Sequence, residues 1–106
     1  MPDANYWKSE MDVTYREIQE INDKLRDLQE NENYAWEHAE DLLKASREAQ
    51  AEGNMPEHEE KRQAFREASN YRSTLLNQIS DLKMRKQALW DQHNQAKAEW
   101  RRLRGQ

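Results

Sequence analysis

The chain contains no cysteine, and it has only two glycines and two prolines among its 106 residues. Without cysteine it can form neither a disulfide nor a thiolate metal site. Loop-rich and disordered chains carry far more glycine and proline than this. No apolar run is long enough for a membrane span or a signal peptide, so we expect a cytoplasmic protein that makes no membrane contact. These absences favour long, uninterrupted helices.

The interior glycine and the interior proline lie three residues apart, at Gly53 and Pro56. Glycine tolerates the left-handed conformation that commonly ends a helix, and proline suits the first turn of the next one. Asn54 is a suitable N-terminal cap between them, and Asp3 is one for the first helix. The sequence therefore predicts one domain over 1–106, with a helix over about 4–51, a turn over 52–56 and a helix over about 57–104.

Both predicted helices carry a heptad repeat abcdefg, in which mostly apolar residues occupy positions a and d. In the first helix these positions hold Ala4, Trp7, Met11, Thr14, Ile18, Ile21, Leu25, Leu28, Glu32, Ala35, Ala39, Leu42, Ser46 and Ala49. In the second they hold His58, Lys61, Phe65, Ala68, Arg72, Leu75, Ile79, Leu82, Lys86, Leu89, His93, Ala96, Trp100 and Leu103. We call these a and d positions the seam.

Folding the chain back at Gly53 pairs residues whose numbers sum to about 107, such as Trp7 with Trp100 and Leu42 with Phe65. Every a position then faces a d position, as an antiparallel coiled coil requires. The sequence thus predicts an all-α fold, a long antiparallel two-helix hairpin of the coiled-coil type. Residues 1–52 carry 14 acids and 6 bases, whereas residues 53–106 carry 7 acids and 11 bases, and this opposition favours the same pairing.

Large apolar residues also occur at e positions, beside the seam. We call them the e-position stripe, and they are Tyr15, Trp36, Leu43, Leu76 and Trp90. One interpretation is that they only thicken the contact between the two helices. The other is that they bind a second hairpin or a partner helix, because several exposed apolar side chains together favour association. The second interpretation predicts a homodimer in the form of a four-helix bundle.

Sequence features that would indicate catalysis or metal binding are absent. None of the three histidines follows a Glu-x-x-His pattern, and no phosphate loop or nucleophile motif occurs. His93 lies opposite Thr14 in the predicted register, which is typical of a hydrogen-bonded, half-buried histidine. Glu32 and Arg72 lie one layer apart in the seam and either pair across it or extend to water. We expect no enzyme activity, no metal and no cofactor.

A function related to nucleic acids is the alternative. Basic residues and one aromatic residue gather at the C-terminal end, at Lys97, Trp100, Arg101, Arg102 and Arg104. Such a cluster can contact phosphates, although cations also belong at a helix C-terminus. The first helix could instead imitate DNA with its carboxylates, at Glu20, Asp23, Asp27, Glu30, Glu37, Glu40 and Asp41.

Two protein families resemble this chain in outline. In size and hairpin shape it is similar to the small secreted proteins that carry a Trp-x-Gly turn and pair into four-helix bundles; here the turn reads Glu52-Gly53-Asn54. It also resembles the coiled-coil finger of bacterial transcript-cleavage factors, which carries acids at its tip, as Glu52 and Glu57 do here. Neither resemblance implies functional residues for this chain.

The sequence therefore predicts a non-catalytic protein–protein interaction module. Such a module acts as an adaptor, an assembly factor or a small inhibitor of another complex. It would bind a second copy of itself or another protein through a helical surface.

Overall fold

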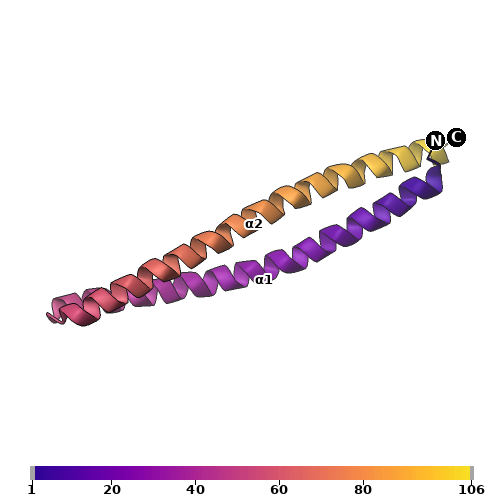
Figure 1. The fold of residues 1–106 in the computed structure, drawn as a ribbon. Helices are drawn as coiled ribbons and strands as arrows, with labels where there is room; N and C mark the ends of the chain where they lie inside the picture. The colour runs from indigo at the N-terminus through magenta and orange to yellow at the C-terminus, as the bar shows by residue number, and fades with distance from the viewer. Residues whose placement is uncertain (1, 106) are drawn as a thin grey trace. The chain divides into compact units, whose positions relative to one another are not determined.

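The computed structural model describes residues 2–105 and consists of two long helices joined by a short turn (Figure 1). Helix α1 spans Ala4–Ala51 and helix α2 spans Met55–Arg104. No strand occurs among the described residues. The predicted all-α class is confirmed, and two long helices lie in contact. Helix α2 begins two residues before the predicted position 57, because Asn54 is the residue that caps it.

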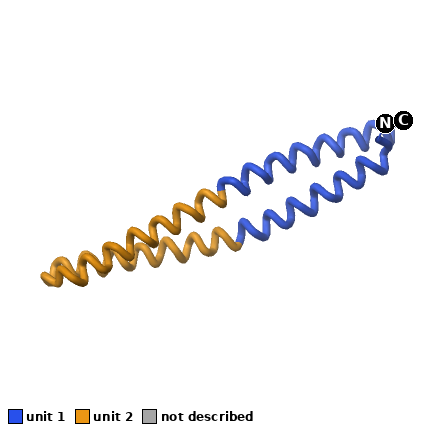
Figure 2. Tube along the Cα trace, in the orientation of Figure 1, with its two compact units in different colours: residues 1–26, 80–106 blue, residues 27–79 orange. Residues whose placement is uncertain are grey.

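The chain divides into two compact units, in each of which a segment of α1 lies beside a segment of α2 (Figure 2). Unit 1 consists of residues 1–26 and 80–106, and unit 2 of residues 27–79. Unit 1 therefore holds the two ends of the chain, and unit 2 holds the turn. The single domain predicted for 1–106 stays a prediction.

The turn in unit 2 closes with the hydrogen bonds of a Schellman motif. Gly53 has a φ of 76°, its N–H donates to the carbonyl of Gln50, and the N–H of Asn54 donates to the carbonyl of Ala49. The side chain of Asn54 then accepts a hydrogen bond from the N–H of Glu57 at 3.2 Å and donates to its carboxylate at 2.9 Å. The predicted roles of the glycine and the asparagine are confirmed.

The core of unit 1 is built from long aliphatic side chains. Ile18, Ile21, Leu25 and Leu89 are buried, and Ile18 is fully so. Asp3 caps α1 by accepting a hydrogen bond from the N–H of Tyr6 at 2.9 Å, as predicted. Among residues 2–26 and 80–105 of unit 1, all of the buried side chains occupy seam positions.

The core of unit 2 changes in character toward the turn. Leu75 and Ile79 are buried at the end remote from the turn, whereas nearer to it the buried residues are Ala39, Ser46, Ala49 and His58. All of the buried side chains in unit 2 also occupy seam positions. Small residues remove little apolar area from water, so each layer near the turn contributes less stability than a layer of leucines.

We predict that the turn end opens more readily than the open end of the hairpin. Amide hydrogen exchange near Ser46 and Lys61 is expected to be faster than near Leu25 and Leu82, because local opening is easiest where few apolar contacts are lost. Mass spectrometry of peptides from the exchanging protein measures this difference. Equal protection, or slower exchange near Ser46, would contradict the prediction.

Candidate protein-interaction surface

The e-position stripe is distributed over both units. Trp36, Leu43 and Leu76 belong to unit 2, and Tyr15 and Trp90 belong to unit 1. Tyr15 is 52% exposed, Trp36 45% and Leu76 42%, whereas Leu43 and Trp90 are half-buried. Most of the predicted binding residues therefore reach the surface, although their role in binding stays a prediction.

In unit 1 the two stripe aromatics both pack against His93. The ring of Trp90 meets it edge-on at 5.4 Å between centroids, and the ring of Tyr15 lies 6.2 Å away. His93 Nδ1 lies 3.2 Å from the carbonyl oxygen of Met11, which can only accept, so Nδ1 carries the hydrogen. The same nitrogen lies 3.1 Å from Thr14 Oγ1, which confirms the predicted half-buried, hydrogen-bonded histidine. Tyr15 and Trp90 thus contribute to packing inside the chain.

In unit 2 an ion pair crosses the seam beside Trp36. Arg72 Nε lies 2.7 Å from Glu32 Oε1, and the guanidinium stacks on the Trp36 ring at 4.4 Å from its centroid. Of the two alternatives that the sequence left open, pairing across the seam is the one that forms. One face of Trp36 is therefore covered by Arg72 while the side chain as a whole remains 45% exposed.

Nearer to the turn, unit 2 contains a buried hydrogen-bond network that the sequence analysis missed. His58 Nδ1 lies 2.9 Å from both the carbonyl oxygen and the Oγ of Ser46, and Ser46 Oγ donates to the His58 carbonyl at 3.3 Å. Both residues occupy a positions, so the heptad pattern already placed them in the seam. Among residues 2–105 no three acidic or histidine side chains converge where they could hold a metal ion.

A groove beside the Ser46–His58 network is the main surface feature that sequence reasoning did not identify. Leu43 and Phe65 supply its apolar part, and Arg47, Arg62 and Arg66 supply its charge. The signal that could have revealed it is the pair Arg62 and Arg66, four residues apart and hence on one side of α2.

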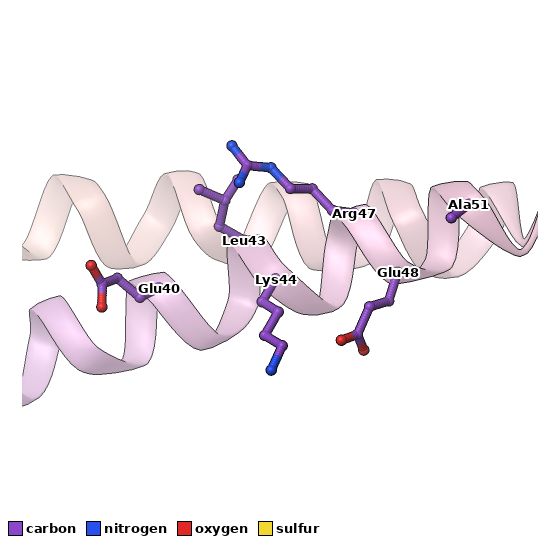
Figure 3. A pocket seen from close by; sticks show the side chains of 6 residues that line it. All are labelled: Glu40, Leu43, Lys44, Arg47, Glu48 and Ala51. Carbon is purple, nitrogen blue, oxygen red and sulfur yellow. The ribbon is translucent and has the colours of Figure 1, made fainter.

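A second hollow on α1 adjoins this groove and shares Leu43 and Arg47 with it. Figure 3 shows the side chain of Arg47 extending over Leu43, while Lys44 and Glu48 point the other way. The stripe residue Leu43 is thus the point at which apolar and cationic surfaces meet.

Two of the four basic residues at the C-terminal end of α2, Arg102 and Arg104, make contacts within unit 1. Arg102 pairs with Glu99 at 2.7 Å, and the guanidinium of Arg104 stacks on Trp100 at 4.9 Å. Lys97 is half-buried and Arg101 is exposed. Nucleic-acid binding by this cluster stays a prediction.

Comparison with known proteins adds no relative: no family model, no curated protein and no solved structure matches this chain. Within the described residues, neither helix contains a stretch long and apolar enough to cross a membrane.

Proposed function

We propose that this chain is a non-catalytic protein–protein interaction module that binds a helical partner through the e-position stripe. The observation that carries the proposal is the exposure of Trp36 and Leu76 in unit 2, at 45% and 42%. Large apolar side chains gathered on one surface mark sites of association, because covering them removes apolar area from water. An adaptor, an assembly factor and a small inhibitor all act through a surface of this kind.

A second copy of the chain is the first partner to test. Stacking two hairpins would cover the exposed stripe residues and so add buried apolar area to each chain. Two hairpins that stack through the stripe would form the four-helix bundle predicted from the sequence, and two-fold pairs are the commonest assemblies. The proposal is therefore self-association through the stripe.

Leu43→Glu together with Leu76→Glu tests this proposal. Both residues lie outside the seam, so a charge at either position should leave the two helices intact while it disfavours burial of the stripe. Light scattering of the wild type is expected to give at least twice the 12.8 kDa chain mass. The double variant is expected to be a helical monomer or to associate at least tenfold more weakly.

The matched control is Gln29→Glu with Ser69→Glu, which places the same charges at polar e positions of unit 2. This control should keep most of the wild-type association, because no apolar contact is lost. A wild type that stays monomeric at high micromolar concentration would contradict self-association. The stripe would then remain a surface for a different protein.

A further inference from the structure

Two surfaces of unit 2 carry opposite charge. The first is the groove of about 390 Å³ described above, where Arg47, Arg62 and Arg66 surround Leu43 and Phe65 and where no lining residue is acidic. Within residues 2–105, none of these three arginines has a carboxylate within 4 Å. The groove therefore combines an apolar floor with guanidinium groups whose N–H groups can donate hydrogen bonds to a bound carboxylate.

The second surface lies on α1 around Tyr34, which is 70% exposed. Carboxylates precede and follow it at helical spacing, at Asp27, Glu30, Glu37 and Asp41, and all four are exposed. None of the four has a cation within 4 Å in the described part of the chain. We call this surface the acidic face: one exposed aromatic ring with carboxylates on both sides.

The groove and the acidic face of one chain cannot reach each other. Tyr34 and Leu43 are nine residues apart on α1, which at 3.6 residues per turn places them on opposite sides of the helix. A second copy of the chain can bring its acidic face to the groove. The match is chemical as well as electrostatic, because an aromatic ring suits the apolar floor and carboxylates suit guanidinium groups.

We infer that the groove of one chain binds the acidic face of a second copy, so that self-association joins unlike surfaces head to tail. This inference keeps the self-association of the proposed function but replaces the two-fold stack of stripes, in unit 2, by a contact between unlike surfaces, to which the stripe contributes Leu43. A two-fold stack centred on the groove would instead bring Arg62 and Arg66 of one copy toward the same cations of the other. Like charges brought together disfavour that arrangement.

Head-to-tail contacts leave one groove and one acidic face unoccupied at the ends of every open assembly. Such contacts generate open chains unless the rotation between copies closes a ring. The mean mass is therefore expected to rise with protein concentration beyond the mass of a dimer. Because the contact is rich in exposed charge, association is expected to weaken when the salt concentration rises from about 0.05 M to about 0.5 M.

Two variants, each lacking one surface, provide the test. Arg62→Gln with Arg66→Gln removes two cations from the groove, and Tyr34→Ala with Glu37→Gln removes the ring and one carboxylate from the acidic face. All four residues are exposed, so the helices should persist, and circular dichroism checks this. Lys83→Gln with Arg85→Gln is the matched control for the first variant, since it removes the same charge from exposed positions outside the groove.

Sedimentation velocity is the measurement. Each variant alone is expected to be largely monomeric, whereas an equimolar mixture is expected to form a discrete one-to-one complex. That complex stops at two chains because only one intact groove and one intact acidic face are available. The Lys83 and Arg85 control should assemble as the wild type does.

Either of two results would overturn the inference. One is a closed dimer that forms at low and at high salt, both in the wild type and in the two surface variants. If Leu76→Glu dissociates that dimer, the proposed stripe function stands. The other is an equimolar mixture of the two variants that forms no complex, so that each variant sediments as it does alone. A wild type that is monomeric at every protein and salt concentration tested would contradict both the head-to-tail contact and self-association through the stripe.

Discussion

Replacing Ile18 with alanine is expected to lower the free energy of unfolding by about 2–4 kcal/mol. Ile18 is fully buried, at 0% exposure, in the seam of unit 1. Its truncation removes apolar contacts and leaves a space that neighbouring side chains fill only in part. Because domains of this kind are stable by only about 5–15 kcal/mol, the loss is a large share of the total. Urea unfolding followed by circular dichroism measures it, at a fixed protein concentration because association adds to apparent stability.

Val13→Ala is the control for this prediction. Val13 lies on the same helix five residues earlier and is 43% exposed. Its truncation is expected to change the free energy of unfolding by no more than about 0.5 kcal/mol. Equal losses for the two variants would mean that Ile18 is not in the core of unit 1.

Replacing Arg72 with leucine is expected to cost about 1–3 kcal/mol of stability. The Glu32 side chain is only 15% exposed, and Arg72 is its partner at 2.7 Å. Without the guanidinium, a largely buried carboxylate loses its hydrogen-bond donor and is poorly reached by water. The stacking of Arg72 on Trp36 is lost as well.

Adding Glu32→Leu to Arg72→Leu is expected to recover most of that loss, because the second change removes the unpaired carboxylate and adds apolar area. The double-mutant cycle should therefore show a coupling energy of at least about 1 kcal/mol. The exposed pair Asp23 and Arg26, at 3.7 Å with side chains 71% and 67% exposed, supplies the comparison. Its coupling is expected to stay below about 0.5 kcal/mol. Similar coupling in the two pairs would show that burial of Glu32 has no energetic effect.

The helices and the turn could be predicted because their signals are local. Gly53 adopts the predicted left-handed conformation, and Asn54 caps α2 within three residues of itself. The buried side chains were predicted for a similar reason. A strict seven-residue repeat places the same face of each helix toward its neighbour wherever the helices run side by side, so the heptad alone identified Ile18 and Leu89 as core.

The candidate surfaces were predicted less completely. The e-position stripe follows from the repeat, but its members differ in ways that the repeat does not encode. Tyr15 and Trp90 pack against His93, and Trp36 lies under Arg72, whereas Leu76 is 42% exposed. Which aromatic side chain finds a neighbour depends on the rotamer that each adopts, and the heptad pattern sets only the direction of the Cβ atom.

By itself, then, the sequence determined the two helices, the turn between them and the residues that face inward, since each depends on neighbours within about one heptad. The tertiary structure alone decided that Ser46 bonds to His58, that Glu32 pairs with Arg72, and that cations from both helices line one groove. These contacts join residues 12 to 40 positions apart. Their formation depends on the axial offset of the two helices and on side-chain reach, because a shift of one turn would give each polar group a different neighbour.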